Sequence, residues 1–156
     1  MFGRTRKEVE IYQDLTEQTW EVEADRSQIE QVVMNLYLNA SQAMTDSGSI
    51  FLKTTNIICD EQYVRAHGVP SGKYVKVSVR DTGCGMDEEV KRRIFEPFFT
   101  TKQMGRGTGL GLASAFGIIK NHNGFIDVES RPDQGTTFNI YFPATEKAQQ
   151  SEVQSS

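Results

Sequence analysis

The sequence is poor in cysteine, with only Cys59 and Cys84 among its 156 residues. The two thiols lack metal-ligand spacing and are too few for a disulfide framework, so we expect both to be reduced in an intracellular protein. No stretch approaches the roughly 20 apolar residues that span a bilayer, and the polar start has no signal-peptide pattern. These absences predict a cytoplasmic domain without direct membrane contact, whether or not the full-length protein carries a membrane anchor.

Basic residues are also in the minority. The chain has 17 Lys and Arg against 21 Asp and Glu, which gives a formal net charge of −4. A nucleic-acid partner requires a clustered basic face, and we therefore expect none. This length can bury one core, and we expect one domain over 10–143, after an N-terminal extension (1–9) and before a polar tail or linker (144–156).

A long helix is predicted for residues 25–44. Asp25 is the predicted N-cap, and Gln28 three residues later makes a variant of the capping box. Apolar residues recur at helical spacing and form one stripe, which consists of Ile29, Val32, Val33, Leu36, Ala40, Ala43 and Met44.

The remaining pattern mixes strands and shorter helices. Strands are expected at 11–15, 19–23, 50–58, 73–80, 125–130 and 136–142, a loop at 67–72, and helices after Asp87 and at 109–121. Within 73–80, Val75, Val77 and Val79 alternate with polar residues, which predicts one buried face. Because strands and helices do not alternate strictly, the predicted class is α+β, a two-layer sandwich with helices on one face of a sheet.

Asn35 and Asn39 lie four residues apart on the long helix and therefore share one face, at the flank of the apolar stripe. Amides at the border of a core need partners, and in one interpretation they bond to backbone or cap loops. In another, their oxygens serve a hard cation such as Mg²⁺, which keeps waters and substrate phosphates as its other ligands. The pair alone leaves both interpretations open.

Residues 81–85 place a carboxylate, Asp81, at the end of the alternating strand and before two glycines. Such a carboxylate can meet the donor groups of a ligand while the glycine backbone approaches closely. An ordinary turn, in which the Asp side chain bonds to its own backbone, is the alternative.

Glycines occupy every second position from Gly105 to Gly111 and are followed by a helical pattern. Free backbone N–H groups at a helix N-terminus favour an anion. Neither the Walker phosphate loop nor the dinucleotide fingerprint fits this spacing. The segment before it, 95–102, contains three phenylalanines around a proline and indicates a hydrophobic clip with a mobile continuation that can close over a ligand. Lys102 and Arg106 would then reach phosphate oxygens.

In order and spacing, these segments resemble the catalytic ATP-binding domain of sensor histidine kinases, within the GHKL superfamily of gyrase, heat-shock chaperone and mismatch-repair ATPases. The matching segments are 30–40 (asparagine box), 81–85 and 107–112 (glycine boxes), 95–102 (phenylalanine box) and 134–138 (closing Gly-Thr motif). The form of the phenylalanine box is most similar to that of the nitrogen-regulation group. The resemblance implies the GHKL ATP-binding fold, with a mixed and mostly antiparallel sheet.

The resemblance also implies a site for ATP and Mg²⁺. Asp81 would accept the adenine amine, with Gly83 and Gly85 close to the base and Thr136 or Thr137 near the adenine pocket. Asn39 would bind the metal with Asn35 assisting, and these two residues and Lys102 would be catalytic. The other implied nucleotide contacts are Phe99, Lys102, Arg106, Gly107, Thr108, Gly109, Leu110, Gly111 and Leu112.

Transfer rather than hydrolysis is implied by Asn35. Hydrolysing relatives place a Glu at this position, and an amide cannot replace it as general base. The γ-phosphoryl group would pass to a histidine on a dimerisation and phosphoacceptor hairpin, and then to the receiver domain of a response regulator. Neither His67 nor His122 has the acceptor context, and we expect His122 to be structural. The isolated domain should be a monomer that does not autophosphorylate.

Two other functions stay open on the sequence. One is a nucleotide-gated binding module without kinase activity, although no box is broken. The other is a serine kinase similar to those that act on anti-sigma-factor antagonists, against which the absence of the Glu counts.

Overall fold

The computed structural model describes residues 8–44, 47–97, 99 and 111–145. The elements follow one another as β1 (Glu8–Leu15), α1 (Arg26–Ala43), β2 (Ser47–Cys59), α2 (Glu61–Val64), a 3-10 turn η1 (Arg65–His67), β3 (Gly72–Asp81), α3 (Glu88–Arg93), α4 (Gly111–Asn121), β4 (Phe125–Ser130) and β5 (Thr136–Pro143). Among the described residues, no helix combines the length and hydropathy that crossing a bilayer requires.

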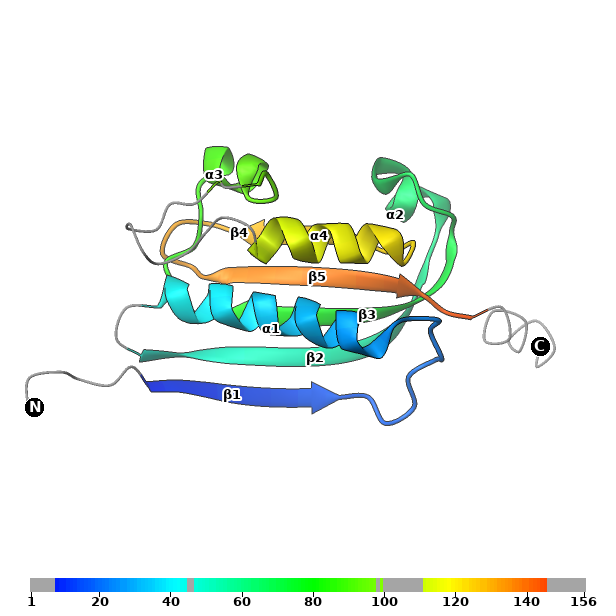
Figure 1. Ribbon diagram of the computed structural model, residues 1–156, viewed down its shortest axis with the longest axis horizontal. Helices are drawn as coiled ribbons and strands as arrows, with labels where there is room; N and C mark the ends of the chain where they lie inside the picture. The colour runs from blue at the N-terminus through cyan, green and yellow to red at the C-terminus, as the bar shows by residue number, and fades with distance from the viewer. Residues whose placement is uncertain (1–7, 45–46, 98, 100–110, 146–156) are drawn as a thin grey trace, which may run out of the picture.

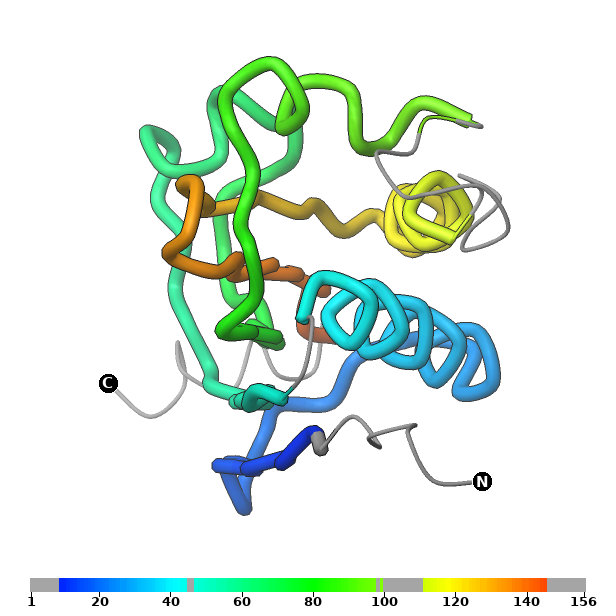
Figure 2. The backbone as a smooth tube through the Cα atoms, turned by 90° about the vertical axis from the view of Figure 1, so that its left-hand side faces the viewer, coloured from blue at the N-terminus to red at the C-terminus, as the bar shows by residue number. Residues whose placement is uncertain are grey.

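The five strands form one mixed sheet in the order β1-β2-β3-β5-β4. The edge strand β1 runs parallel to β2, and the other three pairs are antiparallel. The helices α1 and α4 lie side by side on one face, and α2 lies on the other, as Figures 1 and 2 show. The predicted α+β class, with a mostly antiparallel sheet and the main helices on one face, is confirmed.

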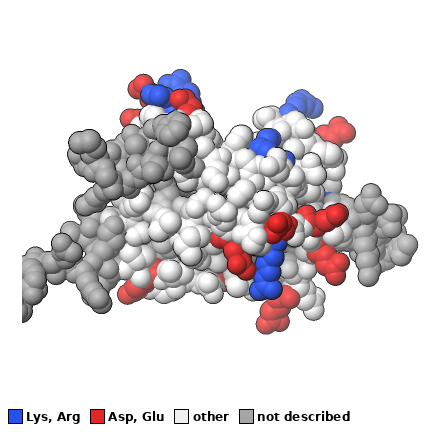
Figure 3. Space-filling model, viewed as in Figure 1, with Lys and Arg blue, Asp and Glu red and all other residues white. Residues whose placement is uncertain are grey.

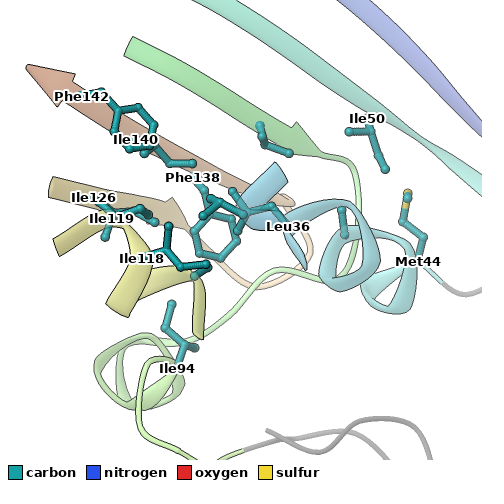
Figure 4. Packing of buried hydrophobic residues seen from close by; sticks show 14 residues of the cluster. Leu36, Met44, Ile50, Ile94, Ile118, Ile119, Ile126, Phe138, Ile140 and Phe142 are labelled. Carbon is teal, nitrogen blue, oxygen red and sulfur yellow. The ribbon is translucent and has the colours of Figure 1, made fainter. Parts of the chain in front are cut away.

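The main core fills the space between this sheet and the two long helices. Val77 and Val79 of β3 face it, as their alternation predicts, and Val75 is buried opposite Phe142 of the same core. Side chains from α1, α4 and β5 point toward one another there (Figure 4); the buried members of the cluster include Leu36, Ala115, Ile118, Ile119, Phe138 and Ile140. Burial of this apolar surface provides most of the driving force for folding.

The start of α1 is capped as predicted, but not by a full capping box. The Asp25 carboxylate accepts the N–H groups of Ser27 at 3.0 Å and Gln28 at 3.4 Å. The Asp25 N–H, which Gln28 would accept in a capping box, instead donates to Nε2 of His122 at 3.1 Å. The hydrogen bond from the Ser27 hydroxyl, together with the two backbone N–H groups of the cap, holds the pKa of the Asp25 carboxyl below its usual range.

A second, smaller core lies on the opposite face of the sheet. Phe125 stacks on Tyr141 with ring centroids 4.2 Å apart, and Tyr74 meets Phe125 edge to face. Cys59 and Val64 complete this buried cluster. Local sequence patterns did not predict α2 and η1, which cover this core.

One predicted strand is wrong. Residues 19–23 form no strand, and only Val22 makes a single bridge, to Ala144. The segment is instead tied down by other contacts: the Trp20 N–H donates to the Asn56 side chain at 2.9 Å, and the Thr145 N–H donates to the Glu21 carbonyl at 2.8 Å. These bonds satisfy the backbone without a neighbouring strand.

Candidate functional site

The predicted site residues within the described ranges gather at one end of the helix-covered face. Asp81 ends β3 and Thr136 begins β5, and the two residues are direct partners in the antiparallel register. Directly paired residues place their side chains on the same face, and this face carries Val79 and Phe138 of the main core. Asp81 and Thr136 are 3% and 4% exposed. Of the two threonines proposed near adenine, the structure therefore brings Thr136 to Asp81, whereas Thr137 pairs with Arg80 on the opposite face.

The Asp81 carboxylate is the buried charged group of this site. Its Oδ1 accepts the N–H of Gly83 at 2.8 Å, which is the turn-forming contact considered as the alternative for this segment. The turn is also fixed from outside, because the Cys84 N–H donates to the Ala43 carbonyl at the end of α1 at 3.0 Å. A carboxylate with one oxygen held in this way is pre-oriented for a further donor.

The glycines of this turn are required by neighbouring protein segments. A Cβ on Gly83 would lie 2.7 Å from the Ala43 carbonyl oxygen, and one on Gly85 would lie 1.9 Å from that of Arg131. Gly85 also has φ +70°, a conformation that favours glycine. The first glycine box thus packs α1 and the β4–β5 turn against the end of β3, in addition to any approach to a base.

Ser130 belongs to this site, although no sequence motif indicated it. Its Oγ lies 2.8 Å from the Thr136 Oγ1, donates to the Gly135 carbonyl at 3.0 Å, and accepts the Met86 N–H at 2.8 Å. Because the Ser130 proton goes to Gly135, the Thr136 hydroxyl is the donor to Ser130. The available signal was the register, which pairs Ser130 with Thr136 across β4 and β5.

Both asparagines of α1 are half-buried, at the border of the core. The Asn35 Nδ2 donates to the carbonyl of Gly111, the first residue of α4, at 3.1 Å. Because only the amide nitrogen can donate, this bond fixes which end of the Asn35 amide is oxygen. Asn39 lies one turn further along α1, between this contact and the Ala43 end that meets Gly83. The start of α4, the two amides and the Asp81 turn therefore follow one another along α1.

The described part of the phenylalanine box is attached to the core. Phe95 stacks on Phe116 of α4 with centroids 5.0 Å apart and meets Phe138 edge to face at 6.5 Å. The Arg93 guanidinium lies over the ring of Phe99 at 4.4 Å. The hydrophobic clip thus joins α3 to α4, and Leu112 packs partly buried against the same core.

Six of the predicted contacts lie outside the described residues: Lys102, Arg106, Gly107, Thr108, Gly109 and Leu110. Their proposed roles therefore remain predictions. In the view of Figure 3, charged side chains of both signs gather over α3 and around the start of α1, while the described surface between them is largely uncharged.

Comparison with known proteins places this arrangement among ATPases. A profile of the family described as histidine kinase-, DNA gyrase B- and HSP90-like ATPase matches residues 24–146. The chain is 46% identical over 138 residues to the sensor kinase CckA of Brucella abortus, covering 88% of this chain and 15% of that protein.

Solved structures agree with this placement. The catalytic domain of the histidine kinase ThkA, in a nucleotide-free form, is 34% identical with a TM-score of 0.69, covering 89% of this chain and 81% of that one. Full-length ShkA in complex with AMPPNP is 28% identical with a TM-score of 0.69, covering 88% of this chain and 26% of that one. The chain spans 15% of the length of CckA and 23% of the length of the sensor histidine kinase ZraS of Escherichia coli, to which it is 39% identical over 123 residues.

Proposed function

This chain belongs to the family of histidine kinase-, DNA gyrase B- and HSP90-like ATPases, and we propose that it is the ATP-binding catalytic part of a sensor histidine kinase. It binds Mg–ATP and transfers the γ-phosphoryl group to a histidine on a dimerisation and phosphoacceptor hairpin outside this chain. The phosphoryl group then passes to the receiver domain of a response regulator. The observation that carries the proposal is the buried Asp81 carboxylate, which is paired with Thr136 at the end of the sheet. The turn that follows Asp81 contacts Ala43 at the end of α1, the helix that carries Asn39.

Adenine binds at the Asp81 end of the site. The carboxylate accepts the exocyclic amine and thereby favours adenine over guanine, which presents a carbonyl at that position. Gly83 and Gly85 form the turn beside the base, and Thr136, whose hydroxyl bonds to Ser130, is the register partner of Asp81. Because Asp81 is almost fully buried, a base bound there is shielded from water, and a hydrogen bond to the charged oxygen is strengthened.

The phosphates extend from Asp81 along α1 toward the start of α4. Gly111 and the preceding glycines offer backbone N–H groups to them, with Lys102 and Arg106 supplying positive charge. Phosphoryl transfer of this kind rests on positioning and charge stabilisation, and no nucleophile within this chain is required.

Mg²⁺ fits the same face through the amide oxygens. Among the described residues, no three carboxylate, imidazole or thiolate groups come together as a metal site. Mg²⁺ commonly keeps several waters and is otherwise held by substrate phosphates and one or two protein oxygens, which Asn39 and, beside it, Asn35 provide. The ion would neutralise phosphate charge. Asn35 itself cannot activate water as a base, which favours transfer over hydrolysis.

Calorimetric titration with a non-hydrolysable ATP analogue tests the proposal. We expect saturable binding that Mg²⁺ strengthens and that GTP does not reproduce. Asn39→Ala should remove the Mg²⁺ enhancement without loss of the folded state by circular dichroism, and Leu38→Ala, an exposed neighbour on the same helix, should leave it intact. A folded protein that binds no nucleotide would overturn the proposal.

Phosphoryl transfer needs a second test. The chain alone should bind ATP without labelling itself, and should label a separately supplied phosphoacceptor hairpin from a sensor kinase of this family. An acid-labile product indicates phosphohistidine. An acid-stable product would show a serine kinase, and the absence of any labelling would show a nucleotide-gated binding module.

A further inference from the structure

The side chain of His122 joins the two helices that carry the site. It follows directly after α4, next to the N-cap of α1, and each ring nitrogen has one partner. Nδ1 lies 2.8 Å from the carbonyl oxygen of Ile118 in the last turn of α4. Nε2 lies 3.1 Å from the backbone N–H of Asp25.

These partners fix the tautomer of the ring. A carbonyl oxygen only accepts and a backbone N–H only donates, so Nδ1 carries the proton and Nε2 is the acceptor. The same bond satisfies the one N–H of the α1 start that a capping box would have bonded to Gln28. The Asp25 carboxylate is occupied by Ser27 and Gln28, and the ring of Phe142 lies edge-on to the imidazole at 6.3 Å. The ring is therefore held on three sides.

The two helices run antiparallel and are tied by polar contacts near both ends of α4. One contact is the Asn35 amide on Gly111, beside the proposed phosphate and metal positions. The other is the His122 imidazole on Asp25. Between them the contact surface is apolar, with Val32 and Leu36 of α1 and Ala115, Ile118 and Ile119 of α4 in the same core. Apolar packing alone is non-directional, and the directional contacts are those at the two ends.

From this arrangement we propose that His122 is a positioning residue for the nucleotide site, acting through the register of α1 against α4. The inference rests on the proposed function. Asn39 is presented by α1, whereas the phosphate-binding backbone leads into α4, so ATP and its metal are bound correctly only when the two helices hold one relative position. Without the Asp25 contact, the pair samples other registers, and apparent affinity falls in proportion to the fraction that remains competent.

Three substitutions at His122 separate this role from simple support of the fold. His122→Gln places an amide oxygen where Nε2 accepts from Asp25. His122→Asn keeps a donor near Nδ1 but cannot reach Asp25, and His122→Ala removes both contacts. With the Mg²⁺-bound ATP analogue, the Asn and Ala variants should bind about threefold to tenfold more weakly, as expected for one hydrogen bond of ordinary net strength. The Gln variant should stay within about twofold of the parent protein.

Val64→Ala is the matched control for stability. Val64 is buried at 3% exposure in the second core, on α2 and away from both helices. It should lower the melting temperature without changing affinity, measured at a temperature where every variant is folded. The positioning role would be overturned if all three His122 variants bound the ATP analogue with the same affinity as one another. It would also be overturned if Val64→Ala lowered that affinity as much as His122→Ala does.

The tautomer gives an independent readout. With the His122 imidazole in its neutral form, long-range ¹H–¹⁵N spectra should show a proton on Nδ1 and none on Nε2. A proton on Nε2 would contradict the contact with Asp25 whether or not nucleotide binds. If the parent protein itself binds no ATP analogue, the proposed function fails, and a Nδ1-protonated His122 would then show a structural contact only.

Discussion

At the scale of single residues, the Asp81 carboxylate fixes the turn at Gly83 and is also proposed to bind adenine. Asp81→Asn keeps an oxygen that accepts the Gly83 N–H, so the turn should persist. Its neutral amide cannot replace the charged acceptor for the adenine amine. Affinity for the ATP analogue should fall by about 1.5–3 kcal/mol, the range for hydrogen bonds to charged groups.

Calorimetry of the Asp81→Asn variant, with circular dichroism as the control for folding, measures this loss. Retention of full ATP affinity in a folded variant would show that the base is recognised elsewhere.

Two glycines with nearly the same backbone angle separate strain from steric overlap. Gly68 has φ +66° with no atom within 4 Å of an added Cβ, whereas Gly85 has φ +70° with the Arg131 carbonyl oxygen at 1.9 Å. Gly68→Ala should cost about 1–2 kcal/mol for the left-handed conformation alone. Gly85→Ala should cost clearly more, because the backbone of the β4–β5 turn must also move.

Urea unfolding of the two alanine variants gives both free energies. Equal decreases in the free energy of unfolding would mean that the turn carrying Arg131 moves without a measurable loss of stability. The packing role of Gly85 would then be wrong.

The functional groups of the candidate site could be predicted from the sequence better than the packing around them. Asp81, Asn35 and Asn39 carry functional groups whose spacing can be read from the chain. That Gly85 adjoins Arg131 depends on the pairing of β3 with β5, which are distant in the sequence, and local pattern does not specify that pairing. The bond between Ser130 and Thr136 lies across the β4–β5 hairpin, whose two strands the sequence did predict.

At the scale of elements, α1 has leucines with opposite environments. Leu36 is fully buried against the sheet, and Leu38 is 53% exposed. Leu36→Ala should lower the free energy of unfolding by about 2–5 kcal/mol, whereas Leu38→Ala should change it by no more than about 0.5 kcal/mol.

Equilibrium urea denaturation provides the comparison, since the two substitutions remove the same side-chain atoms from the same helix. Similar losses at both positions would contradict the orientation of α1.

Sequence patterns predicted all five strands and the helices α1, α3 and α4, and they did so most clearly for α1 and β3, which have long, regular periodicity. The segment 19–23 alternates like a strand, but its backbone is satisfied by Asn56 and Thr145, so tertiary contacts override the pattern. The helix α2 has only four residues, too few to show a helical period. Its N-cap, Asp60, which accepts the Tyr63 N–H at 2.8 Å, was the one local signal.

At the scale of the whole molecule, the second core makes the free energy of unfolding decrease as pH rises through the alkaline range. Burial raises the pKa of the Cys59 thiol from 9.0 to about 11, with the nearby Asp60 carboxylate adding to the shift and Lys76 opposing it. The unfolded chain therefore releases this proton first as pH rises. The stabilising effect of the protonated thiol is present below about pH 9 and is lost progressively up to about pH 11. Burial also raises the pKa of Tyr74, in the same direction.

Urea unfolding between about pH 8 and pH 11 should show a falling free energy of unfolding, with a shallower slope in Cys59→Ala. The substitution lowers stability at every pH, so the slope is the quantity compared. Parallel slopes in the two proteins would assign the alkaline loss to other groups.

The pairing of β3 with β5 gives the scaffold a tolerance for change in chain length. Asp81 and Thr136 meet only when everything between them, including α3, segment 100–110 and α4, has been enclosed in one loop. The entropy of closing a flexible loop grows only with the logarithm of its length, about 0.6 kcal/mol for each doubling. Insertions or deletions between Phe99 and Gly111 therefore weigh little on the sheet, and evolution or protein engineering can vary the length of this span while the scaffold stays the same.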